Sequence, residues 1–280
     1  MRLAATASPT ILSMIHKAAV LGLMLVLTLG AGPALGAGAR EDLGCLVRAY
    51  PDFLASVQGD TAVVSRTGEV FPYDENLGER TYHELLDRAD LRAQMSQPYP
   101  TQALTEPPAV NADPGRLRSN RFFRQLYGAT EAEVRRNVQA VYWAPCNCYL
   151  AFNGKNGAAA ALRAVGEEVA RTPSLARYVS KPLGSFNWRK VAGSGRMSVH
   201  ASAAAIDFNL PDSLGRYWRW DGCRQDAVCK YPTAVLEREE LKEIVRIFES
   251  QGFIWGGKWY HYDAMHFEFR PELVGPRCKG

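Results

Sequence analysis

The sequence predicts an α+β fold in which helices flank an antiparallel central sheet. Residues 130–138, 156–171 and 237–250 repeat apolar side chains at helical spacing. Residues 205–210 and 265–269 alternate apolar with polar side chains, as a strand with one buried face does. These helices and strands show no regular strand–helix–strand rhythm, so an antiparallel sheet is expected instead of a parallel one.

Residues 1–36 are predicted to be a signal peptide. The apolar run of residues 18–30 follows Arg2 and Lys17 and precedes small residues that suit cleavage. The run is short for a membrane span. We therefore expect a mature chain without a membrane span and a periplasmic or secreted location. An uncleaved anchor is the alternative.

Residues 37–115 are interpreted as an N-terminal extension ahead of a domain that covers residues 116–280. Five prolines between residues 96 and 115 indicate an extended loop and a boundary between the two parts. Before that loop the patterns predict, in order, a short helix near residues 42–54, a hairpin over residues 61–71 and a helix over residues 81–95.

The second part opens with a predicted helix. Thr130 and Glu133 have the spacing of a capping box. A strand is expected at residues 141–143, and Asn156 is expected to cap the next helix. Gly252 is expected to end the helix over residues 237–250.

Composition narrows the choice of partners. The chain of 280 residues is 47% hydrophobic and 22% charged, with a formal net charge of +4. This charge is too small for a nucleic-acid partner, so none is expected. We expect a monomer.

The six cysteines indicate disulfide bonds in an exported chain. Cys223 and Cys229 flank a short polar loop and are the easiest pair to close. Spacing does not choose among the possible pairings of the other four cysteines, which are Cys45, Cys146, Cys148 and Cys278. A half metal site at residues 146–148 is the less favoured alternative, because no second cysteine or histidine pair lies nearby.

Two histidines and an aspartate form a candidate metal site. Alternation places Asp207 on the polar face of one strand and His266 on the polar face of another. Neighbouring strands would bring both side chains together, and the small residues after His200 allow it to fold back over Asp207. Two imidazoles and one carboxylate leave the fourth zinc position open to water, as catalytic sites do.

Two spaced motifs surround these residues. They are Ser198-x-His200-x-x-Ala203-x-Ala205-x-Asp207, and Trp255-Gly256-Gly257-Lys258-Trp259 followed by Asp263-x-x-His266-Phe267-Glu268. Together they resemble the signatures of the D-alanyl-D-alanine carboxypeptidase family of zinc peptidases, the VanY-like group, which is related in fold to the zinc domain of hedgehog proteins. The likeness covers about residues 143–273 and implies that residues 116–280 form a zinc peptidase catalytic domain.

The resemblance implies site roles for individual residues. It makes His200, Asp207 and His266 the ligands of Zn²⁺ and Asp263 the acid/base carboxylate. Since strand positions three apart face opposite sides, Asp263 is expected on the turn before its strand.

Further residues are assigned around this set. Glu268 is a rival base or a partner of His200. Arg189 is expected to polarise the scissile carbonyl or hold a substrate carboxylate, and a surface arginine stacked on Trp188 is the alternative. Ser198, Trp259 and His261 are expected to contact substrate, although a surface position is the alternative for His261.

One departure from the family pattern concerns the first motif. Ala203 stands where the family has glycine. If the position needs a positive φ, alanine strains the loop and the geometry of His200 is affected.

The predicted function is hydrolysis of amide bonds in peptidoglycan stem peptides by a zinc-dependent peptidase, with release of a terminal D-alanine. An endopeptidase that cuts between L-alanine and D-glutamate uses the same chemistry and is one alternative. A zinc-containing cell-wall binding module without turnover is the other.

Overall fold

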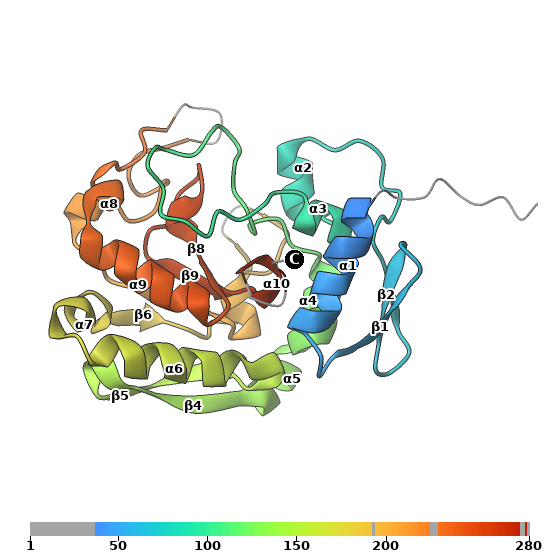
Figure 1. Ribbon diagram of the computed structural model, residues 1–280, viewed down its shortest axis with the longest axis horizontal. Coiled ribbons are helices and arrows are strands. Elements are labelled where there is room, and N and C mark those ends of the chain that lie inside the picture. Colours follow the sequence, from blue (N-terminus) through green and yellow to red (C-terminus); the bar gives the residue numbers. More distant parts are fainter. Residues whose placement is uncertain (1–36, 192–193, 225–228, 275–277, 279–280) are drawn as a thin grey trace, which may run out of the picture. The chain divides into compact units, whose positions relative to one another are not determined.

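The computed structural model describes residues 37–191, 194–224, 229–274 and 278 (Figure 1). Helices and antiparallel sheets make up this part, which confirms the α+β class. The strands form three separate sheets instead of one. The predicted signal peptide lies outside the described residues. Within the described residues, every helix is too short or too polar to cross a membrane.

The N-terminal part of this chain forms a helix and a three-stranded sheet. Helix α1 (Ala37–Ala49) precedes β1 (Leu54–Gln58), β2 (Ala62–Ser65) and β3 (Val70–Pro72), which pair antiparallel in that order. The β2–β3 pair confirms the predicted hairpin, whereas β1 has no counterpart in the sequence prediction. Leu43 and Leu46 of α1 share a buried cluster with Phe71 and Phe122.

The single helix predicted over residues 81–95 is two short helices. They are α2 (Tyr82–Asp87) and α3 (Leu91–Met95). Asp90 causes the break, because its Oδ1 accepts a hydrogen bond from the Ala93 amide at 2.9 Å and so caps α3. Asp90 is fully buried and also accepts from Arg80 at 2.9 Å. A buried carboxylate needs such partners, so local helical spacing is overridden here.

A hairpin covered by helices follows the proline-rich loop. The elements are α4 (Asn120–Tyr127), α5 (Glu131–Asn137), β4 (Val138–Trp143), β5 (Cys148–Asn153), α6 (Ala158–Ala170) and α7 (Pro173–Val179). Thr130 caps α5 by accepting from the Glu133 amide, as predicted. Asn156 does not cap α6: its backbone is left-handed, with φ 56°, and Gly157 occupies the cap position.

The candidate site lies on a four-stranded antiparallel sheet of order β6-β7-β9-β8. Its strands are β6 (Pro182–Gly184), β7 (Ala205–Phe208), β8 (Phe253–Trp255) and β9 (His266–Phe269), and the remaining helices are α8 (Ala234–Glu237), α9 (Glu239–Ser250) and α10 (Pro271–Val274). The inward residues predicted for α9 are buried, and Phe248 stacks on Phe267 of β9 with ring centroids 3.9 Å apart. Packing against α9 holds β9 in place from the side opposite the site.

Three disulfide bonds pair the six cysteines. Cys223–Cys229 confirms the predicted pair, and the others are Cys146–Cys148 and Cys45–Cys278. The last bond joins α1 to the residues that follow α10. In the same region the hydroxyl of Tyr50, the residue after α1, donates to Glu272 of α10 at 2.5 Å.

Candidate metal centre

Asp207 and His266 face one another across two paired strands. Strands β7 and β9 are antiparallel, and their register places Asp207 directly opposite His266. Ile206 and Phe208, the neighbours of Asp207, are fully buried on the core side. Strand alternation therefore sends both polar side chains to the other face, as the sequence predicts.

His200 reaches this face from a tight turn before β7. The turn spans Val199–Ser202, and the Ser198 hydroxyl accepts a hydrogen bond from the His200 amide at 3.3 Å. Ala203 closes the turn with φ 51°, the positive value that the family's glycine suggests. Asn153 holds this conformation, because its backbone N–H donates to the Ala203 carbonyl at 2.7 Å.

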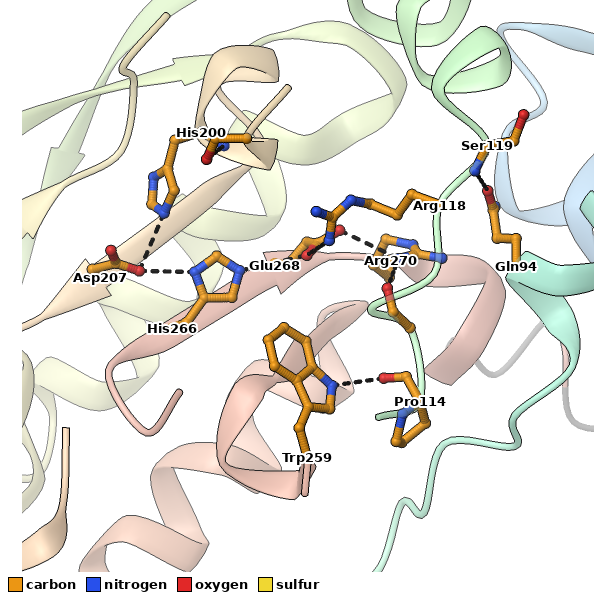
Figure 2. Close-up of polar contacts among 12 residues, drawn as sticks. Gln94, Pro114, Arg118, Ser119, His200, Asp207, Trp259, His266, Glu268 and Arg270 are labelled. Atoms are coloured by element: carbon orange, nitrogen blue, oxygen red, sulfur yellow. Dashed lines mark hydrogen bonds and ion pairs between the residues drawn. The ribbon is translucent and has the colours of Figure 1, made fainter. Parts of the chain in front are cut away.

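The two imidazoles converge on one carboxylate oxygen (Figure 2). Nε2 of His200 lies 3.2 Å from Oδ1 of Asp207, and Nδ1 of His266 lies 2.8 Å from the same atom. One potential ligand atom from each of the three residues lies within 4.8 Å of the others. Such spacing suits three ligands of a single ion.

The remaining ring nitrogens have acceptors of their own. Nδ1 of His200 donates to the Ser185 carbonyl at 3.3 Å, and Nε2 of His266 donates to Glu268 at 3.4 Å. Since these acceptors can only receive a proton, they leave His200 Nε2 and His266 Nδ1 to offer lone pairs to a metal. This arrangement is the usual support of ligand histidines, so the residues present fit zinc.

Carboxylates and histidines shift one another's pKa values at the centre. Burial raises the pKa of Asp207, but His200 and the hydrogen bonds from both histidines outweigh burial and hold that pKa well below its usual range. Burial and the charge of Asp207 raise the pKa of Asp263 to about 7. Burial lowers the pKa of His266, but Asp207 and Glu268 outweigh it and raise that pKa to about 10. The carboxylates of Asp207 and Glu268 stabilise a positive charge on His266, and the same negative charges would stabilise a bound divalent cation.

Asp263 lies on the turn before β9, where the spacing predicts it. Its amide donates to the Gly256 carbonyl at 2.9 Å, and its own carbonyl accepts from the His266 amide at 3.1 Å. The side chain lines the same cavity as the three candidate ligands. Its Oδ1 is buried and has no hydrogen-bond partner among the described residues. A carboxylate in this position is able to accept a proton from a group inside the cavity.

Glu268 belongs to a buried ion-pair network. It lies 2.9 Å from Arg118 and 3.3 Å from Arg270 (Figure 2). Arg270 in turn lies 2.6 Å from Glu272. Burial raises the pKa of Glu268, but the charge of Arg118 and the hydrogen bond from His266 outweigh it and lower the pKa to about 2. The predicted partnership with His200 is wrong, because Glu268 contacts His266 and the Nδ1 of His200 bonds the Ser185 carbonyl instead. These contacts favour a role in orienting His266 over a role as the base.

A cavity of about 500 Å³ opens over the three candidate ligands. Arg189, Ser198, Trp259 and His261, the residues predicted to contact substrate or its carbonyl, all line it. Arg189 is exposed, while the Ser198 hydroxyl is engaged in the turn that carries a ligand. Trp259 donates its indole N–H to the Pro114 carbonyl at 2.8 Å.

His261 is buried, so its surface alternative is wrong. It is 3% exposed, its Nδ1 lies 2.6 Å from Asp113, and Tyr82 stacks on its ring with centroids 5.5 Å apart. Both partners come from residues 37–115. Sequence spacing carries no signal for contacts of this range.

Further arginines that line the cavity are not revealed by the sequence patterns. Four guanidiniums join Arg189 around the cavity: those of Arg116, Arg118, Arg196 and Arg219. They come from three separate segments, so no local motif marks them. Only the fold brings them to one place.

One comparison with known proteins matches part of the chain to a protein family. Residues 192–269 match the family model described as D-alanyl-D-alanine carboxypeptidase, which confirms the family that the two motifs suggest. The matched segment contains His200, Asp207, Asp263 and His266. Searches of curated proteins and of solved structures each returned no match.

Proposed function

Since residues 192–269 match a family of peptidases that act on D-alanyl-D-alanine ends, we propose that the chain is a zinc-dependent peptidase acting on peptidoglycan stem peptides. The bond it cleaves is the amide that precedes a terminal D-alanine. The single observation that carries this proposal is the convergence of His200, Asp207 and His266, with Asp263 beside them, on the floor of one cavity.

The roles follow from the contacts of each side chain. His200, Asp207 and His266 would hold Zn²⁺. The ion would lower the pKa of a water molecule and polarise the substrate carbonyl. Asp263 accepts the proton of the attacking water and passes it to the leaving amine. Ser185 and Glu268 keep the two histidines in the tautomer and orientation that this site needs.

Arg189 is proposed to stabilise the substrate. Its guanidinium lies at the exposed side of the cavity and donates within the described chain to the Lys190 carbonyl at 3.4 Å. Five donors on a planar group allow it to hold a carboxylate or the developing oxyanion. Ser198, Trp259 and His261 line the remaining wall beside the peptide.

Location, fold family and domain organisation complete the proposal. Disulfide bonds persist in oxidising compartments, and the three bonds support a periplasmic or secreted protein with residues 1–36 as its signal peptide. We also propose that residues 116–280 form the catalytic domain with a fold of the hedgehog and D-alanyl-D-alanine peptidase type, and that the protein acts as a monomer.

Metal analysis and product identification test the proposal. Protein comprising residues 37–280 should contain about one zinc per chain by mass spectrometry of the metal, and His266→Ala should contain almost none. Incubation with a stem pentapeptide should release one D-alanine. Release of a fragment cut after L-alanine would assign the endopeptidase activity instead, and zinc without any product would indicate a binding module.

A further inference from the structure

A second, smaller hollow adjoins the metal cavity. Its volume is about 100 Å³, and it shares four lining residues with the larger cavity: Arg116, Arg196, Arg219 and His261. Trp218 and Asp87 also line the smaller hollow. Because the same side chains line both spaces, a molecule bound over the metal ligands is able to extend a group into the hollow.

Two buried donors in this wall lack acceptors. Trp218 is 2% exposed, and its indole Nε1 has no hydrogen-bond partner in the described chain. Nε of Arg196 is likewise buried without a partner among the residues described. A buried N–H that lacks an acceptor costs free energy. Two such groups beside one hollow indicate that an acceptor from outside the chain completes them.

The charges around the hollow are mostly positive. Arg116 is paired with Asp113 at 3.4 Å, and Arg219 lies over the Trp218 ring at 5.0 Å. Asp87 is 3.9 Å from Arg196, at the limit of an ion pair, and its side chain is half exposed. Such a pair neutralises little charge.

Neighbouring arginines add to this imbalance. Burial, together with the charges of Arg118 and Arg116, lowers the pKa of Arg196 to about 10. His261, which also faces the hollow, is held by Asp113 through its Nδ1. An anion placed between these groups offsets the repulsion among the arginines.

We propose that this hollow is an anion subsite in which Arg196 and the Trp218 indole N–H bind a carboxylate of the substrate peptide. The inference rests on the proposed peptidase function and assigns the residues that recognise a carboxylate of its substrate. A carboxylate accepts several hydrogen bonds and pairs bidentately with a guanidinium, which matches a wall made of donors.

Two carboxylates of a stem peptide could enter the subsite. One is the terminal α-carboxylate, and the other belongs to the acidic residue nearer the start of the peptide. Three probes separate them: the stem pentapeptide, its C-terminal amide, and the same peptide with only the acidic side chain amidated.

Binding is measured without turnover. In chelator-treated protein labelled with nitrogen-15 at its six tryptophans, Trp218→Phe identifies the Trp218 indole signal by its loss. The free pentapeptide should move that signal downfield, as a new hydrogen bond does. The amidated peptide that no longer shifts the signal identifies which carboxylate is bound. An unchanged signal with the free peptide, or the same shift with both amides, would refute the subsite.

Kinetics with the zinc-loaded enzyme supply the second test. Arg196→Met should lower kcat/KM for the acidic peptide by about 10- to 100-fold, the usual effect of a lost charged hydrogen bond. The amidated peptide that fails to shift Trp218 should react equally with both enzymes, and Arg196→Lys should recover part of the loss. Arg163→Met removes an equal charge from the exposed side of α6 and should leave kcat/KM unchanged.

The two proposals fail separately. Hydrolysis of the pentapeptide without a Trp218 shift would retain the peptidase and reject the subsite. A Trp218 shift without hydrolysis would retain the subsite and reject the peptidase. An equal loss of kcat/KM for acidic and amidated peptides in Arg196→Met would show that Arg196 only supports the fold.

Discussion

Asp207 and His266 occupy directly opposite positions in the β7–β9 pair, and Oδ1 of the aspartate lies 2.8 Å from Nδ1 of the histidine. A one-residue slip of this register would send one of them to the core side of the sheet. The buried neighbours Ile206 and Phe267 pair across the same strands and prevent that slip. Hydrophobic packing on one face thus sets the geometry of the candidate metal site on the other.

Replacing the proposed base should separate metal binding from catalysis. Asp263→Asn should retain zinc, because Asp263 is not among the three converging residues. It should lower kcat by about 10²- to 10⁴-fold, the usual contribution of a general base. Metal analysis and initial rates on the pentapeptide measure both effects. Asp52→Asn, at an exposed turn, is the control and should match wild type; full activity of Asp263→Asn would assign the base elsewhere.

Glu268→Gln should damage both stability and zinc affinity. The change removes the negative charge that pairs with the buried guanidiniums of Arg118 and Arg270. An unpaired buried charge should lower the unfolding free energy by about 3–5 kcal/mol. Zinc affinity should fall about 10- to 100-fold, because the support of His266 is lost. Urea unfolding and competition with a chelator measure these quantities.

A surface glutamate provides the matched control for that change. Glu243 pairs with Arg246 at 2.6 Å on the exposed face of α9. Since exposed pairs contribute little, Glu243→Gln should change the unfolding free energy by less than about 1 kcal/mol. Equal losses from the two variants would show that the Glu268 network does not stabilise the fold.

Asp113 should make stability depend on acid pH. Burial raises the pKa of Asp113, but the hydrogen bond from His261 and the charge of Arg116 outweigh it, so the pKa lies below its usual value. A lowered pKa contributes stability above the unfolded pKa, about 4, and this contribution disappears as pH falls through the folded pKa.

The stability advantage of wild type over Asp113→Asn should therefore be full at pH 6 and shrink below about pH 4. Urea unfolding at pH 6, 4 and 3 measures the difference. Asp52→Asn, which changes an exposed carboxylate, should show no comparable trend. A difference that grows on acidification would contradict the assigned direction.

The three disulfide bonds should contribute unequally. Cys45–Cys278 spans 233 residues, whereas Cys146–Cys148 spans only 2. Loop-closure entropy grows with loop length, so serine replacement of the long-range pair should cost about 3–5 kcal/mol and of the short pair about 1–2 kcal/mol. Denaturant unfolding of the two double variants measures both costs. A larger loss from the short pair would contradict this account.

Local patterns predicted much of the fold around the site. Apolar spacing located α6 and α9 and the faces they bury, and period-two alternation located β7 and β9. The patterns failed at two places, one where a buried carboxylate breaks a helix and one where the backbone is left-handed. Asp90 splits a predicted helix, and the left-handed Asn156 and Gly157 replace a predicted cap.

The sequence by itself determined which side chains are candidates for the site, because alternation places Asp207 and His266 on polar strand faces and the short spacing after His200 allows it to fold back over Asp207. Tertiary structure alone decided what surrounds them. Glu268 meets Arg118 across 150 positions of the chain, and His261 meets Asp113 across 148. Such contacts depend on how distant segments pack, and their energies arise only when burial removes both charges from water, so no local pattern encodes them.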